Sequence, residues 1–163
     1  MYKKIIVPLD GSRTAECVLP HLDVVAKGCG TQEVILMSVT ESVTGYTEKV
    51  QPGYTGSTLP PPNPVMEVPA RTGKKQQQAE RYLARVAKRL RDKGFLVRIE
   101  VLTGSPAQEI VTYAQKNNCD LIIMASHGRS GIDRWAHSIG AYGGVADKVL
   151  RASPVPVLMV KAT

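Results

Sequence analysis

The fold is decided by the stretch Leu121-Ile122-Ile123-Met124-Ala125-Ser126-His127-Gly128-Arg129-Ser130-Gly131, with Gly143-Gly144-Val145-Ala146 downstream of it. The stretch begins as an apolar run of strand length and ends in a turn of small residues and glycines. The glycine pair at 143–144 then opens a short helical pattern. Backbone N–H groups at such turns and at a helix N-terminus attract phosphate. These two segments therefore predict a cradle for a nucleotide phosphate after a strand.

Apolar runs alternate with helical patterns along the rest of the chain. This alternation is typical of repeated β-α units around a mainly parallel sheet, and 163 residues fit one such domain. We expect a single-domain α/β fold over residues 1–163, with five strands and helices on both faces of the sheet. The expected strands are 4–9, 33–39, 95–102, 120–125 and 155–160, and the expected helices are 13–27, 74–93, 106–117 and 145–151.

Prolines and glycines refine these boundaries. Ser12 is a candidate N-cap for the first helix, Pro20 predicts a kink inside it, and Gly28 and Gly30 are expected to end it. Gly94 follows the second helix, where a left-handed residue is favoured. The alternating strand 95–102 suggests a position near a sheet edge. Pro156 lacks an N–H donor and likewise suits an edge strand, so the strand 155–160 predicts pairing with a second copy in a homodimer.

The segment 42–73 differs from the rest because it is rich in proline and glycine and has no hydrophobic period. Connections of this length are unusual in a compact domain and are often lids or inserts. It is either a cover for a ligand site or an excursion away from the domain. It shows no sign of a second domain.

Charge and cysteine content limit the function. The chain has a net charge of +7, which favours anionic partners. A solvated helix face explains the cationic cluster better than nucleic-acid binding, because no aromatic residues alternate with the cations. Cys17, Cys29 and Cys119 have no metal-ligand spacing, so we expect no protein-held metal. The cationic cluster comprises Lys74, Lys75, Arg81, Arg85, Lys88, Arg89, Arg91 and Lys93.

The chain also lacks features of membrane insertion or export. No apolar run approaches the ~20 residues of a membrane helix, and the first residues lead directly into a strand rather than a signal peptide. We therefore expect a cytoplasmic protein with no membrane partner.

In an open parallel sheet, ligands bind beyond the carboxyl ends of the strands, where the strand order reverses. If the strands at 4–9 and 120–125 flank that reversal, Asp10 and Ser126 converge there. Asp10 has two interpretations of equal weight: it accepts hydrogen bonds from a ribose or an adenine amino group, or it is a carboxylate favoured by the helix dipole. His127 has neither a nucleophile nor an orienting carboxylate in view, so we assign no catalytic residue. Walker A and G-x-G-x-x-G patterns are absent.

Three segments together resemble the universal stress protein (UspA-like) family. They are Lys4-Ile5-Ile6-Val7-Pro8-Leu9-Asp10-Gly11-Ser12, Asp120 to Arg129, and Val145 to Val160. The resemblance covers the chain apart from the insert. It implies the adenine nucleotide alpha hydrolase-like (Rossmann-like) fold, a homodimer through the last strand, and a role in stress tolerance.

One branch of this family binds ATP through the pattern G-x-x-G-x9-G-[ST], and this sequence departs from it. The first glycine falls on Ala125, whose cost would be on the order of 1 kcal/mol if its φ were positive. The second falls on Gly128. The matching pair is Gly143-Gly144, which lacks the hydroxyl and lies five residues later than the pattern requires. Ser138 in the longer loop is a candidate substitute hydroxyl.

The resemblance also implies a set of ligand contacts. Base and ribose contacts fall on Pro8, Leu9, Asp10, Val39, Met124 and Ala125, and phosphate contacts fall on Ser126, His127, Gly128, Arg129, Ser138, Gly143, Gly144 and Val145. Residues such as Met124 and Val39 are more often plain core residues than walls of an adenine site, and only their positions at strand ends favour the contact.

Two functions follow from this reading. The first is a regulatory dimer that binds ATP or AMP, with Mg²⁺ as a possible companion of the nucleotide, an unknown protein partner, and at most slow ATP hydrolysis. The second is a dimeric interaction module of the same fold that binds no nucleotide.

Overall fold

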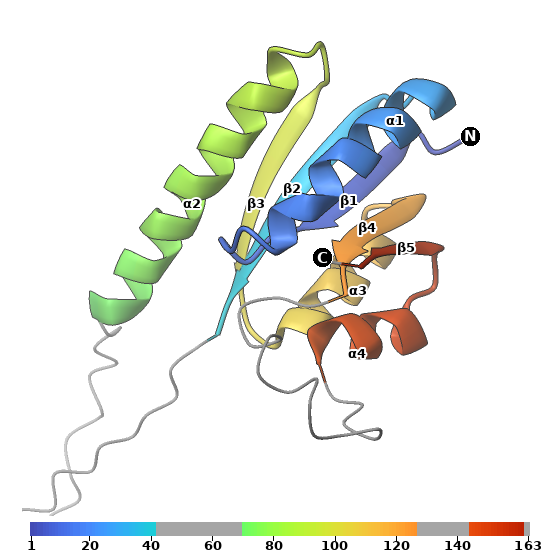
Figure 1. Cartoon of the computed structure of the whole chain (residues 1–163). Helices are drawn as coiled ribbons and strands as arrows, with labels where there is room; N and C mark the ends of the chain where they lie inside the picture. The colour runs from blue at the N-terminus through green and yellow to red at the C-terminus, as the bar shows by residue number, and fades with distance from the viewer. Residues whose placement is uncertain (42–69, 127–143, 162–163) are drawn as a thin grey trace, which may run out of the picture.

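The computed structural model describes residues 1–41, 70–126 and 144–161. Within these ranges the chain forms a sheet of five strands, four α-helices and one 3-10 helix (Figure 1). In chain order the elements are β1 (Lys4–Pro8), η1 (Ala15–Val18), α1 (Leu19–Cys29), β2 (Glu33–Thr40), α2 (Ala70–Arg91), β3 (Val97–Thr103), α3 (Pro106–Lys116), β4 (Leu121–Ala125), α4 (Val145–Ala152) and β5 (Val157–Val160).

The strand order is β3-β2-β1-β4-β5, and every pairing in this sheet is parallel. The prediction of a five-stranded parallel α/β fold is therefore confirmed. The chain starts in the central strand, winds outward through β2 to β3, and then returns to the other side of β1 for β4 and β5. The strand order thus reverses between β1 and β4.

Helices cover both faces of the sheet, as predicted. One buried cluster joins side chains of α1 and α2 to one face, with Ile5, Leu22 and Leu83 fully buried. The other joins α3 and α4 to the opposite face, with Ile6 and Val149 fully buried. Successive residues of β1 alternate between the two clusters because strand side chains alternate between faces.

The first helix differs from its prediction. The segment forms a 3-10 turn at η1 and then α1, so Pro20 lies in the first turn of α1 and produces no kink inside a longer helix. The first turn tolerates proline because its N–H would have no helical partner there. Gly28 lies inside α1, and Gly30 alone ends it, with a left-handed φ of 64°.

The second helix begins earlier than predicted, at Ala70 rather than at Lys74. Gly73 therefore lies inside α2, where the sequence pattern suggested the end of the insert. The rest of the predicted insert, residues 42–69, lies outside the described residues. Gly94 has a φ of 92°, which confirms the left-handed residue expected after this helix.

Both edge predictions are confirmed, since β3 and β5 are the outer strands of the sheet. β5 begins at Val157 rather than at Val155. Pro156 precedes the strand, and its carbonyl accepts a hydrogen bond of 3.0 Å from the N–H of Ile122.

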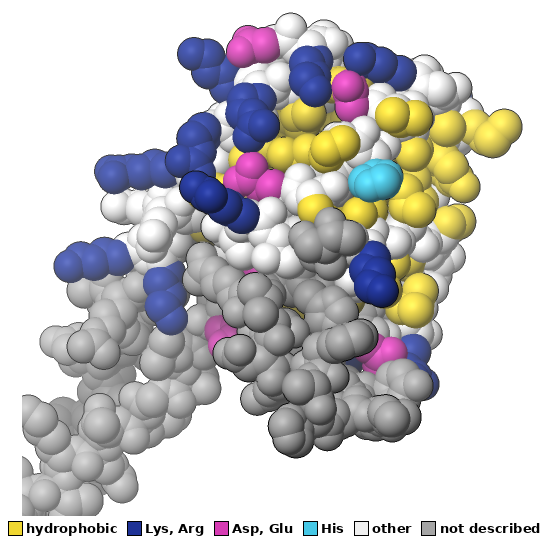
Figure 2. Space-filling view, viewed as in Figure 1, with side chains coloured by type: hydrophobic (Ala, Val, Ile, Leu, Met, Phe, Trp, Pro, Cys, Tyr) yellow, Lys and Arg dark blue, Asp and Glu magenta, His cyan; other side chains and the backbone are white. Residues whose placement is uncertain are grey.

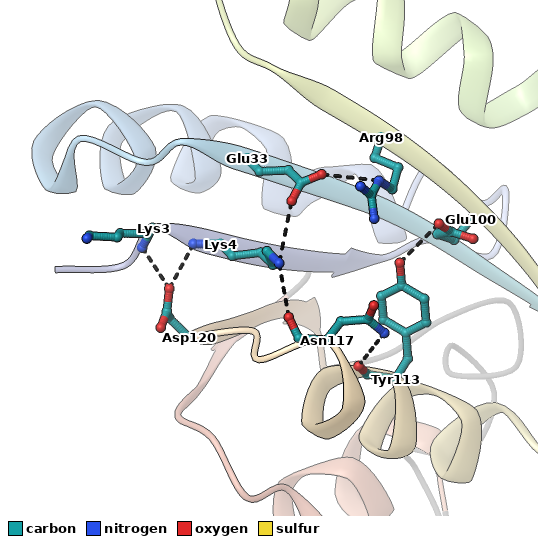
Figure 3. Close-up of polar contacts among 8 residues, drawn as sticks. All are labelled: Lys3, Lys4, Glu33, Arg98, Glu100, Tyr113, Asn117 and Asp120. Atoms are coloured by element: carbon teal, nitrogen blue, oxygen red, sulfur yellow. Dashed lines mark hydrogen bonds and ion pairs between the residues drawn. The ribbon is translucent and has the colours of Figure 1, made fainter.

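Polar contacts tie the amino ends of the strands together (Figure 3). One carboxylate oxygen of Asp120 accepts hydrogen bonds from the backbone N–H groups of Lys3 and Lys4, at 2.9 and 2.8 Å. The ammonium group of Lys4 donates to the Asn117 carbonyl at 3.0 Å and lies 3.7 Å from the Glu33 carboxylate. These contacts fix the entry of β1 between β2 and β4.

Candidate functional site

The strand-order reversal places the candidate site at the carboxyl ends of β1 and β4. The paired register of these strands covers Ile5 with Leu121 and Ile6 with Ile122, whereas that of β1 and β2 continues to Pro8 with Met37. The β1–β4 ladder thus stops short of the carboxyl ends. A parallel sheet opens to a ligand at such a point.

The predicted contact residues on the strands divide by burial. Leu9, Met124 and Ala125 are at most 9% exposed and belong to the core clusters. Their side chains support the sheet, so a ligand at this edge meets mainly their backbone. Pro8 and Val39 are half-buried at the ends of β1 and β2. The core interpretation of Met124 is therefore correct.

Asp10 organises the turn that follows β1. One of its carboxylate oxygens accepts hydrogen bonds from both the backbone N–H and the hydroxyl of Ser12, at 2.9 and 2.6 Å. The Ser12 oxygen in turn accepts the N–H of Ala15, the first residue of η1, at 3.0 Å. The N-cap position of η1 is Thr14 rather than the predicted Ser12. The side chain of Asp10 is exposed at the edge of the sheet.

Two of the departures from the family pattern, Ala125 and Gly144, lie within the described residues, and neither strains the backbone. Ala125 lies in β4, and the positive-φ residues among the described ones do not include it, so the predicted backbone penalty does not arise. Gly144 is the N-cap of α4, with φ −69° and ψ 162° and without a side-chain cap hydrogen bond. A Cβ added there would meet no atom within 4 Å.

The N-terminus of α4 is attached to this region through its buried side. Ala146 is buried in the same cluster as Met124, while Val145 is 40% exposed. The first N–H groups of a helix have no intrahelical partner, and the helix dipole makes this end attractive to anions. Ser126, at the end of β4, uses its N–H to donate to the Val160 carbonyl at 2.8 Å.

Several predicted phosphate contacts lie outside the described residues, namely His127, Gly128, Arg129, Ser138 and Gly143. The structure therefore places the residues predicted to contact the base and the ribose at the carboxyl ends of β1, β2 and β4. From the phosphate half it describes Ser126, Gly144 and Val145.

Tyr82 and Glu16 are neighbours of this edge that the sequence analysis did not select. The hydroxyl of Tyr82 is buried and has no hydrogen-bond partner among the described residues. Burial, together with the nearby carboxylates of Glu16 and Asp10, raises the pKa of Tyr82, so the phenol remains neutral. Tyr82 lies on the partly buried side of α2, and only the fold brings it near Asp10.

A hollow of about 470 Å³ lies at the amino ends of the strands. Its lining includes Lys3, Lys4, Glu33 and Asp120. It is larger than the hollow of about 280 Å³ beside α3 and α4. The charged side chains of Lys4, Glu33 and Asp120 are already engaged in the contacts described above, so the size of this hollow alone does not make it the functional site. The candidate site is instead the strand-order reversal, because ligands of open parallel sheets bind beyond the carboxyl ends of the strands at that point.

Within the described ranges, no group of three or more His, Cys, Asp or Glu side chains is arranged to hold a metal ion. The three cysteines are free thiols. Among the described residues, no helix is both long enough and apolar enough to cross a membrane.

The strand order places the chain in the class of open, doubly wound α/β proteins, in which ligands bind at the strand-order reversal. A family model for the universal stress protein family matches residues 1–161. The chain therefore belongs to the universal stress protein family.

One known member resembles it over nearly the whole length of both chains. Universal stress protein MJ0577 of Methanocaldococcus jannaschii is 32% identical over 99% of this chain and 96% of its own. A solved structure of MJ0577 superposes with a TM-score of 0.73 at 30% identity, covering 100% of this chain and 98% of the other.

More distant structures share the fold and carry ligands. A universal stress protein in complex with cAMP has a TM-score of 0.60 at 17% identity, over 99% of this chain and 98% of that one. A family member from Arabidopsis thaliana with AMP bound has a TM-score of 0.62 at 13% identity, over 99% and 92% of the two chains.

Proposed function

We propose that this protein is a stress-response regulator that binds an adenine nucleotide, ATP or AMP, at the carboxyl ends of β1, β2 and β4. The observation that carries the proposal is the strand-order reversal between β1 and β4, with the ordered Asp10 turn beside it. The adenine and ribose lie against the backbone of these strand ends, and Asp10 accepts a hydrogen bond from the ribose or the adenine amino group.

The uncapped N-terminus of α4 supports the phosphate side of this proposal. Gly144 supplies no side-chain oxygen to the first amide groups of α4, and an anion is favoured at the N-terminus of a helix. Glycines 128 and 143 are proposed to extend the amide array. The Mg²⁺ that accompanies a nucleotide would be held by the phosphates and water.

The ligands of the distant relatives support the choice of nucleotide. The cAMP and AMP named for those two structures share the adenine and ribose groups. In this chain the strand ends of β1, β2 and β4 hold the residues proposed to contact adenine and ribose, the two groups that both of those ligands contain.

The regulatory part of the proposal is a dimer in the cytoplasm. A homodimer forms through the free edge of β5, and the bound nucleotide changes the surface offered to a partner protein. Turnover is slow or absent, since we assign no catalytic base or nucleophile to this site.

Titration calorimetry with ATP, ADP, AMP and cAMP tests the ligand class, with Gly128→Val as the variant. The wild type is expected to bind at least one of them, and a valine at this proposed amide contact should abolish that binding. Far-ultraviolet circular dichroism of the variant controls for folding. The absence of both binding heat and thermal shift at millimolar nucleotide contradicts the proposal.

The longer loop between Gly128 and Gly143, and the missing hydroxyl at Gly144, favour a second candidate, an interaction module that binds no nucleotide. Mass spectrometry of the small molecules released on denaturation separates the two. A co-purified adenine nucleotide excludes the second candidate.

A further inference from the structure

The positive charge of this protein is concentrated on one helix. The chain holds 21 Lys and Arg and 14 Asp and Glu residues. The sequence of α2, ARTGKKQQQAERYLARVAKRLR, contributes eight of the former and one of the latter. Its net charge of +7 equals that of the whole chain, so the remaining residues balance to neutrality.

Four of these cations form one outward-facing stripe. Lys74, Arg81, Arg85 and Lys88 are all exposed, and at 100° per residue they fall within an arc of about 60°. The opposite side of the helix is the buried side, where Leu83, Val86 and Leu90 enter the core. The stripe extends about 21 Å along the axis, at 1.5 Å per residue.

The stripe is not neutralised by the fold. Other cations nearby are paired, since Arg89 lies 3.2 Å from the Glu16 carboxylate and Lys93 lies 3.4 Å from that of Asp23. Within the described part of the chain, no ion pair joins any of the four stripe residues to a carboxylate. Figure 2 shows Lys and Arg side chains gathered along the left-hand side of the molecule, where α2 lies in Figure 1.

One member of the stripe is already oriented. The guanidinium carbon of Arg85 lies 5.6 Å from the centroid of the Tyr82 ring, which is cation–π range. Because this contact restricts the side chain, less conformational entropy is lost when it binds an anion.

The partner that this stripe fits is an acidic protein segment. Arginine guanidinium groups bind carboxylates through two parallel hydrogen bonds, and about 21 Å suits a short run of Asp and Glu residues. A nucleic acid fits less well. No exposed aromatic residue of α2 is available to stack on bases, and a long polyanion would extend beyond the stripe over a surface that is neutral on balance.

We infer that the stripe Lys74, Arg81, Arg85 and Lys88 is a docking site for an acidic segment of a partner protein. The site lies on the outer side of α2 and does not depend on the nucleotide. It therefore goes beyond the proposed function and survives if nucleotide binding fails.

The test measures the fluorescence anisotropy of a labelled hexa-glutamate peptide, which spans about 20 Å when extended, with a labelled short duplex DNA as the competing probe. The stripe variant is K74Q/R81Q/R85Q/K88Q. The matched control, R13Q/K116Q/K148Q/K161Q, removes the same charge from exposed residues elsewhere. Glutamine preserves helix propensity, and thermal melting verifies folding. If the fourfold stripe variant does not fold, R81Q/R85Q takes its place.

At low ionic strength the wild type is expected to bind the peptide, and the stripe variant should bind about tenfold more weakly or worse, as the loss of four exposed ion pairs implies. The control should bind within about twofold of the wild type. Equal weakening in stripe and control variants overturns the proposal, because net charge alone would then explain binding. So does tighter binding of the DNA than of the peptide, or no binding of the peptide.

Discussion

At the scale of single residues, the Asp10 carboxylate shows how one side chain serves both structure and a candidate site. Its two hydrogen bonds to Ser12 fix the turn between β1 and η1, and the same turn presents the end of β1 to solvent.

Cys119 should react slowly with alkylating reagents in the native state. The residue is 4% exposed, and burial is the main cause that raises its thiol pKa. The reactive thiolate is therefore scarcer at pH 8 than for a free cysteine. Peptide mapping after iodoacetamide treatment should find the half-buried Cys29 modified first, and Cys119 modified only with denaturant. Equal native rates contradict the buried assignment.

Gly144→Ser should stabilise α4 and weaken the proposed phosphate site. The backbone of Gly144 already has N-cap dihedrals and space for a Cβ, so a serine oxygen can cap α4. We expect Ser to exceed Ala in stability by about 1 kcal/mol, and to lower ATP affinity relative to Ala because the serine oxygen competes with phosphate for the first amide groups. Gly144→Ala is the matched control, and equal melting temperatures of the two variants would exclude the cap.

At the scale of elements, α1 shows why a proline and two glycines were hard to assign from sequence. Pro20 was predicted to kink a helix that in fact starts beside it. Periodicity alone does not distinguish a 3-10 turn followed by a helix from one longer helix. Periodicity also does not reveal that Gly28 lies within α1 whereas Gly30 lies at its end.

The two glycines of α1 make a matched pair for mutation. Gly28→Ala should stabilise the protein by about 0.5–1 kcal/mol, since the backbone is helical and no atom lies within 4 Å of the added Cβ. Gly30→Ala should destabilise it by about 1 kcal/mol because φ is 64° there. Urea unfolding of both variants is the measurement, and effects of the same sign would contradict the assigned end of α1.

At the scale of the whole molecule, the sequence was enough to predict a parallel sheet of five strands. It was not enough to predict which site residues are buried. The alternation of strands and helices predicted a parallel sheet, and the family resemblance named its type. The helix boundary at Pro20 was missed because periodicity does not distinguish a 3-10 turn from the first turn of a longer helix, and the start at Ala70 was missed because Gly73 suggested the end of the insert. The burial of Leu9 and Met124 follows from both faces of the sheet being covered, which strand-end positions do not reveal.

Dimerisation through β5 is the prediction that belongs to this scale. The carbonyls of Pro156 and Val160 face β4, and backbone groups alternate in direction along a strand. The N–H of Met159 therefore points to the free edge. Sedimentation should find a dimer for the wild type and a monomer for Met159→Pro.

The Met159→Pro variant should keep the ladder between β5 and β4, because it loses only an outward-facing donor. Unchanged far-ultraviolet circular dichroism is the control for this point. A wild-type monomer, or a folded variant that remains dimeric, contradicts pairing through β5.

The central place of β1 also has a consequence for biosynthesis. This strand leaves the ribosome before the other four strands of the sheet, and β2 and β3 can align beside it early. Its other side is completed only when Leu121 reaches Ile5 and Asp120 reaches the amides of Lys3 and Lys4. A nascent chain that ends before this point exposes an apolar strand edge, the kind of surface that chaperones protect and that aggregates form on.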